Sequence, residues 1–149
     1  MAEYFAVNAA EGDVARAVAL RTAYGATAKI RLFKSGFAPT PSTPRATFVA
    51  NESGFHGYAP ITVAVWDPVF VDGSGQAVFS NATSLFFQND DGTLPELVGG
   101  AWLETGGGSP TVEEYADFDP PIPMNTALAA INMEWIVRQP GPSIVSVDS

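Results

Sequence analysis

Three prolines, Pro39, Pro41 and Pro44, restrict how the first third of the chain can fold. Proline fixes φ, lacks a backbone donor and also limits the residue before it, so this stretch fits neither a long helix nor a central strand. The residues just before it alternate basic and apolar side chains, as on a half-buried strand. We therefore expect a strand at 28–33, followed by an extended connector that continues to Pro60.

Short β-prone runs separated by turn residues make up most of the remaining chain. The 14 glycines and 12 prolines favour short strands joined by turns over long helices. The strongest run is Ile61–Trp66, where β-branched residues recur at every second position. The acidic and then proline-rich segment Thr111–Met124 is expected to be irregular. Further strands are predicted at 69–71, 76–80, 82–88, 97–104 and 126–137. Within 97–104, the paired glycines Gly99-Gly100 predict a bulge.

One short helix is predicted near the N-terminus, because Asp13 is a good N-cap and Gly25 a good stop. About eight short strands with turns between them predict a mainly β fold, an antiparallel sandwich or barrel. The apolar residues at 144–147 could add to a neighbour's sheet edge or fray. We expect three parts: an N-terminal arm with the helix at 1–27, a β domain at 28–138 and a C-terminal tail at 139–149.

Charge is distributed unevenly along the chain, whose net charge is -9. From Ala46 to Val137 there is no Lys or Arg, against twelve carboxylates. This asymmetry is either chance or the mark of a basic surface that binds an acidic partner. The acidic remainder argues against nucleic acid as that partner. Six of the seven basic residues lie in the first 45 positions and are the candidate partner-binding residues: Arg16, Arg21, Lys29, Arg31, Lys34 and Arg45.

No catalytic or metal-binding motif is found. His56 is the single histidine and cysteine is absent, so we expect a surface or packing histidine rather than a catalytic one. The acidic pairs Asp90-Asp91 and Glu113-Glu114 do not follow the EF-hand spacing and are expected to be solvated loops. We therefore predict a protein that is not an enzyme and needs no cofactor or metal.

The tryptophans and the hydropathy pattern leave two further questions. Trp66, Trp102 and Trp135 all fall in predicted strands, where core packing is the ordinary explanation, and a glycan-binding surface would need several of them exposed together.

No apolar stretch approaches 18 residues and no secretory signal is recognised, so we expect a product made in the cytoplasm, without a membrane span.

Three sequence segments carry a resemblance to a known family: LFKSGFAPTP at 32–41, GYAP at 57–60 and FDPPIPM at 118–124. With them, the chain resembles a family of small bacteriophage virion proteins, some of which are capsid decoration, or cement, proteins. The resemblance implies a structural protein on the outer capsid surface. Its expected partners are the major capsid protein and its own copies, as a trimer or dimer. The alternatives are a tail, neck or fibre component and a glycan-binding module on the virion.

Overall fold

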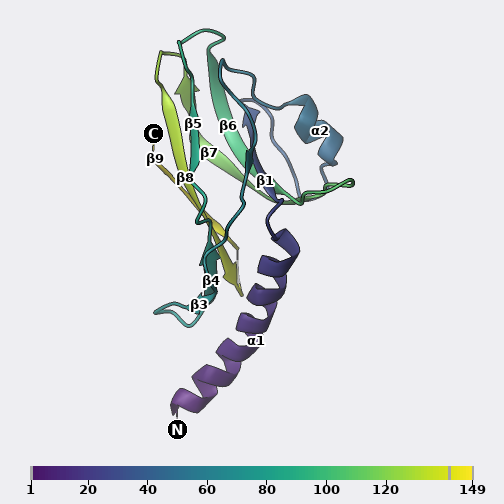
Figure 1. Ribbon diagram of the computed structural model, residues 1–149, viewed down its shortest axis with the longest axis vertical. Coiled ribbons are helices and arrows are strands. Elements are labelled where there is room, and N and C mark those ends of the chain that lie inside the picture. The colour runs from purple at the N-terminus through teal and green to yellow at the C-terminus, as the bar shows by residue number, and fades with distance from the viewer. Residues whose placement is uncertain (1, 141, 149) are drawn as a thin grey trace.

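The computed structural model describes residues 2–140 and 142–148, with side chains from Asp13 onward. The described residues form nine strands in two antiparallel sheets that pack face to face, with a helix at the N-terminal end (Figure 1). The fold class predicted from the sequence is therefore confirmed in its main form, a β-sandwich. Neither of the two described helices has the length and hydrophobicity that a membrane span requires.

The first sheet has the strand order β2-β1-β6-β7. The central pair is β1 and β6, and β7 forms the edge next to β6. A register shift at Gly99 confirms the predicted bulge in β6. The strands of this sheet are β1 Lys29–Lys34, β2 Ile61–Thr62, β6 Glu96–Glu104 and β7 Val112–Met124.

The second sheet is built around β8. β4 and β5 pair with successive parts of the same edge of β8, and β9 pairs with its other edge. The C-terminal residues thus add a strand to their own chain's sheet, rather than fraying or pairing with a neighbour. The strands here are β3 Phe70–Val71, β4 Ala77–Ser80, β5 Leu85–Gln88, β8 Ala130–Gln139 and β9 Ile144–Asp148.

Alternation along β8 shows why its residues form a strand in this sandwich. Every second residue is buried and the residues between them are more exposed, which is the period of two expected for a strand with one face on the core. The buried side chains join others from both sheets in one core. Four of them come from β8: Ile131, Met133, Trp135 and Val137.

Two helices accompany the sheets, α1 Ala2–Tyr24 and α2 Arg45–Ala50. The predicted end at Gly25 is correct, with its φ of 56° in the left-handed region that glycine tolerates. The predicted start at Asp13 is wrong, because the helix is already formed before it. The C-terminal half of α1 packs on β4 and β8 through Ala17 and Tyr24, which are both buried.

Two predictions need correction: the extended connector after β1 and the strand at Ile61–Trp66. The connector after β1 contains α2, because the residues after Pro44 are free of proline and can form one and a half turns. Ile61–Trp66 forms only the two-residue β2. Beyond it the chain crosses to the second sheet, where Val65 bonds to Ala82 and Thr83 and Trp66 makes an isolated bridge.

The segment predicted to be irregular is instead the longest strand, β7. Asp117 pairs with Gly100 and Ile122 with Val98, so the residues between them face a single residue of β6. Pro120 and Pro121 lie in this bulge, where the ladder needs no backbone donor from them. A proline-rich sequence is therefore compatible with this edge strand.

Candidate functional site

The sandwich is open on the side where β7 and β9 end the two sheets. Within the described residues, β7 pairs only with β6 and β9 only with β8, so each strand has one edge without a neighbour. Two hollows lie between these strands, with volumes of about 360 and 380 Å³. Val145 of β9 lines both of them, so together they form one groove, which we call the β7–β9 groove.

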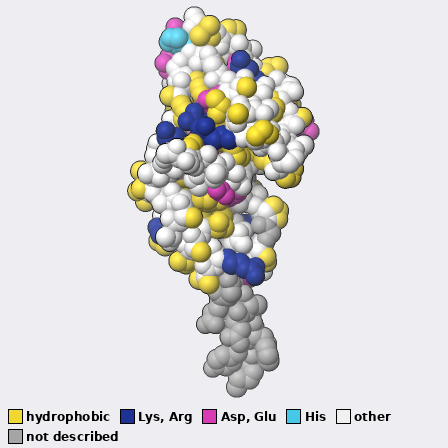
Figure 2. Space-filling view, turned by 90° about the vertical axis from the view of Figure 1, so that its right-hand side faces the viewer, with side chains coloured by type: hydrophobic (Ala, Val, Ile, Leu, Met, Phe, Trp, Pro, Cys, Tyr) yellow, Lys and Arg dark blue, Asp and Glu magenta, His cyan; other side chains and the backbone are white. Residues whose placement is uncertain are grey.

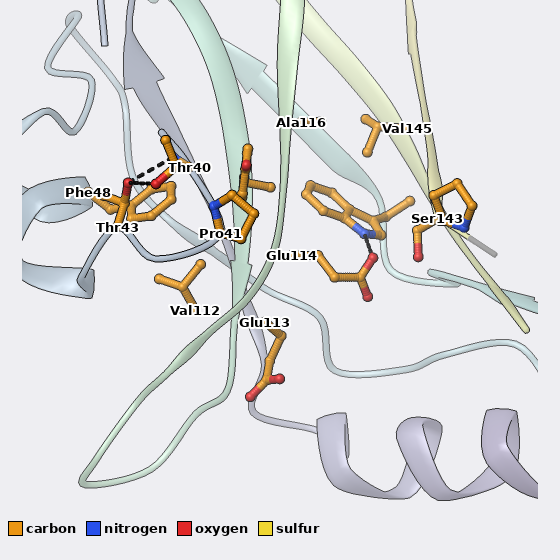
Figure 3. A pocket seen from close by; sticks show the side chains of 13 residues that line it. Thr40, Pro41, Thr43, Phe48, Val112, Glu113, Glu114, Ala116, Ser143 and Val145 are labelled. Carbon is orange, nitrogen blue, oxygen red and sulfur yellow. Dashed lines mark hydrogen bonds between the residues drawn. The ribbon is translucent and has the colours of Figure 1, made fainter. Parts of the chain in front are cut away.

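The first hollow lies beside the N-terminal half of β7 (Figure 3). On one side it is bounded by the loop Thr40–Thr43, and on the other by Ser143 and Val145. Ala116 of β7 lies between these two walls. The edge of β7 is therefore at the bottom of a channel with a wall on each side.

Glu114 is the polar group at the inner side of this hollow. It accepts hydrogen bonds from the Tyr24 hydroxyl at 2.6 Å and from the Trp135 indole nitrogen at 3.2 Å. Burial, together with the charge of Glu114 and the hydrogen bond to it, raises the pKa of Tyr24 above its usual value. The carboxylate links α1, β7 and β8, and among the described side chains it has no ion-pair partner.

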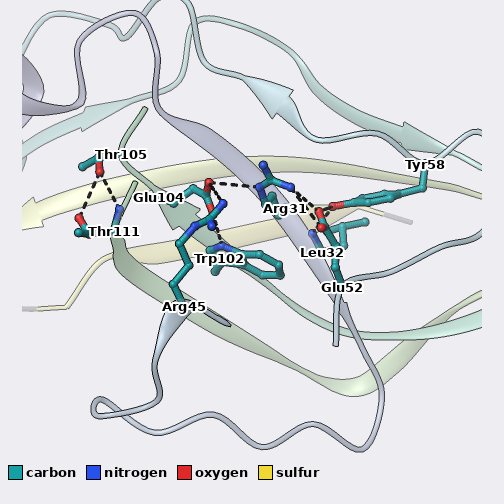
Figure 4. A network of polar contacts seen from close by, with 9 residues as sticks. All are labelled: Arg31, Leu32, Arg45, Glu52, Tyr58, Trp102, Glu104, Thr105 and Thr111. Atoms are coloured by element: carbon teal, nitrogen blue, oxygen red, sulfur yellow. Dashed lines mark hydrogen bonds and ion pairs between the residues drawn. The ribbon is translucent and has the colours of Figure 1, made fainter. Parts of the chain in front are cut away.

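A second polar cluster covers the outer face of the first sheet (Figure 4). Glu104 is 1% exposed and accepts hydrogen bonds from Arg45 and from the Trp102 indole nitrogen. Arg31 lies 3.3 Å from Glu104 and also pairs with Glu52 at 3.0 Å. Four charged side chains thus join β1, α2 and β6, which is a structural arrangement because their charges are balanced internally.

This cluster changes how the predicted partner-binding residues can be interpreted. Arg31 and Arg45 are bound to carboxylates of their own chain, and Arg21 donates to the Trp66 and Asp67 carbonyls. Arg16 is 69% exposed, 3.8 Å from Asp13. The structure therefore brings only Arg31 and Arg45 together.

The remaining two predicted residues, Lys29 and Lys34, lie at the two ends of β1, the first half-buried and the second exposed. Figure 2 shows that basic side chains on this face stand in separate places, from near the top of the molecule to its base. Of the six residues, Arg16 and Lys34 have the most exposed charges, and their role in partner binding stays a prediction.

Of the other side chains considered for chemistry, the structure brings His56 close to the acidic pair Asp90-Asp91. His56 is about half exposed, with its Nδ1 atom 3.3 Å from Asp91 and 3.9 Å from Asp90. Hydrogen bonds from Thr93 lower the pKa of the Asp91 carboxyl. Among the described residues, no group of three His, Cys, Asp or Glu side chains is arranged to hold a metal ion. All three tryptophans are buried, which removes the exposed surface that glycan binding through them would need.

Comparison with family models, with curated proteins and with solved structures gives no match for this chain. The groove had no signal in the sequence, because it depends on two strand edges that belong to different sheets. The short alternation of apolar and acidic residues in 116–119 could have indicated a strand there.

Proposed function

We propose that this chain is a non-enzymatic structural protein of a bacteriophage particle, a capsid decoration protein that stabilises the head by binding between capsomers. Its partners are the major capsid protein and other copies of itself, on the outer surface of the capsid. The resemblance of 30–60 and 118–124 to small virion proteins supports this proposal. The observation that carries it is that both ends of the sandwich have exposed apolar side chains.

One apolar end is formed by the β5–β6 and β7–β8 loops, at the top of Figure 1. Leu94 is 63% exposed and Leu128 65% exposed, and both have positive φ, of 49° and 65°. This conformation is unfavourable for a branched side chain and occurs where the surroundings enforce it. Buried Asn89 joins the two loops, since its side chain donates to the Thr93 and Met124 carbonyls. The apolar side chains are thus held outward by a buried polar residue.

The other apolar end lies near β3, at the lower end of the sandwich in Figure 1. Phe70 and Val71 are 55% and 46% exposed, on a two-residue strand that pairs only with β4 within the described residues. A protein with exposed apolar groups at two distant ends can contact two neighbours at once. Repetition over a symmetric lattice then gives strong total binding from small individual contacts.

The proposal predicts stoichiometric binding to capsids. Purified protein is mixed with expanded, DNA-filled capsids that lack it, and the pellet is analysed after sedimentation. We expect saturation at a fixed ratio to the major capsid protein, because the sites repeat with the lattice. Absence of binding to capsids, with a few copies per virion instead, would contradict this proposal and favour a tail, neck or fibre component.

The apolar ends supply the control for this experiment. Leu128→Ser and Phe70→Ser each remove one exposed apolar side chain at one end, and thermal unfolding of each variant shows whether the fold is retained. Each is expected to weaken capsid binding. The matched control, Thr62→Ser, changes an exposed residue of β2 and leaves both ends intact.

A further inference from the structure

The free edge of β7 lies in a channel with a wall on each side. The channel is the β7–β9 groove, walled by the loop 40–43 and by β9. A sheet edge without a neighbour presents backbone donors and acceptors that an extended segment of another protein can pair with. Prolines interrupt this edge only from Pro120 onward, and register shifts at Glu113 and after Asp117 leave 114–117 as its regularly paired part.

The two faces of β7 differ in chemistry, and they set the pattern of side chains that an added strand would need. Glu114 and Phe118 face the core between the sheets, where Phe118 packs against the main hydrophobic cluster. Tyr115 packs on the opposite face, against Phe48. With the period of two along a strand, exposed Asp117 lies on the same face as Tyr115.

The groove is acidic as well as partly apolar. Among the described residues, no Lys or Arg lines either hollow, whereas Glu113, Glu114 and Asp119 supply carboxylates to their walls. Val145 and Val147 provide the apolar wall on the side of β9. An occupant therefore meets the apolar side chains of β9 and the Glu114 carboxylate on its inner face, and the exposed Asp117 carboxylate on its outer face.

We propose that the β7–β9 groove binds an extended segment of the major capsid protein in which apolar and basic residues alternate, and that this segment pairs with 114–117 as a further strand of the first sheet. This assignment of the partner rests on the proposed function. Apolar residues of the segment enter the groove against Val145, and basic residues lie over Asp117. Complementary charge steers the segment to the edge and sets its register.

Charge reversal at Asp117 tests this proposal, because that side chain is exposed and no hydrogen bond or ion pair within the described residues uses it. With the capsids used above, Asp117→Lys is expected to weaken binding at least about tenfold at low ionic strength, and Asp117→Asn about threefold. The loss should shrink at high salt, where charges are screened. The matched control is Glu134→Lys, which makes the same change on the exposed face of β8.

The outcomes separate this inference from the proposed function. If the unchanged protein does not bind capsids, the proposed function fails. If the unchanged protein, Asp117→Lys and Glu134→Lys all bind capsids with the same affinity, the β7–β9 groove is not the binding site and the inference is wrong. Thermal unfolding of each variant shows whether the fold is retained. Equal weakening by Asp117→Lys and Glu134→Lys would also contradict the inference, since it would indicate a general charge effect.

Discussion

Replacement of Glu104 by alanine is expected to lower the free energy of unfolding by about 3–5 kcal/mol. The carboxylate is buried and is the common partner of Arg31 and Arg45, and it also accepts the hydrogen bond from Trp102. Its removal leaves two guanidinium groups with fewer partners and the buried indole N–H of Trp102 without an acceptor. The measurement is urea denaturation at neutral pH, with the slope of the transition checked for constancy.

A control and a pH series complete this test. Glu134→Ala, at an exposed carboxylate of β8, should change the free energy of unfolding by about 0.5 kcal/mol or less. Burial alone would raise the pKa of Glu104, but the hydrogen bonds from Arg45 and Trp102 and the nearby arginine charges outweigh it and lower that pKa.

A lowered pKa in the folded state stabilises the protein above the ordinary glutamate pKa, and this contribution is lost as the pH falls through the folded-state value. The alanine variant should therefore lose less stability on acidification than the unchanged protein. A loss at neutral pH of under about 1 kcal/mol would show that the cluster around Glu104 does not hold β1, α2 and β6 together.

Replacement of Gly100 by alanine is expected to cost about 3 kcal/mol of unfolding free energy, at the upper end of the range for overpacking. A Cβ atom at this position of β6 would overlap the Ala116 carbonyl oxygen of β7 and the Phe33 ring of β1. Both are in the interior of the sheet, and the carbonyl belongs to the backbone, so neither can move away at little cost.

Gly108→Ala is the matched control for this substitution, because a Cβ atom at Gly108 meets no atom within 4 Å and its φ is not positive. Its effect should be within about 0.5 kcal/mol. The comparison is made by urea denaturation, with far-ultraviolet circular dichroism to confirm the strand content. Equal stability of the two variants would mean that β1, β6 and β7 do not pack as closely at Gly100 as described.

The sequence patterns that depend on local chemistry predicted much of the fold correctly. The alternation in β8 follows directly from one buried face, and the glycine after α1 acts through its own backbone freedom. The paired glycines of β6 are needed instead because a Cβ atom there would overlap neighbouring backbone or the Phe33 ring. Ile61–Trp66 has strong β propensity, yet most of it crosses between the sheets, because tertiary position overrides propensity. The prolines in 111–124 led to the wrong prediction of an irregular segment. They are tolerated in β7 because two of them lie in a bulge opposite β6, which the local sequence does not indicate.

The candidate sites could not be predicted in the same way. Arg31 and Arg45 looked like residues available for a partner, but the fold brings both to Glu104, which lies far away in the sequence. The β7–β9 groove is formed by the edges of two different sheets, so no local pattern encodes it. Contacts of this kind require knowledge of which elements are neighbours in space.

Hydrogen exchange of the capsid-bound protein tests most directly whether β7 is completed by a strand of the capsid protein. In the free protein, the backbone amides of 114–117 that do not bond to β6 should exchange quickly, because they lie at an open edge. We predict that capsid binding slows the exchange of these amides. Protection confined to surfaces away from β7, for example around Arg16 or Lys34, would contradict the account.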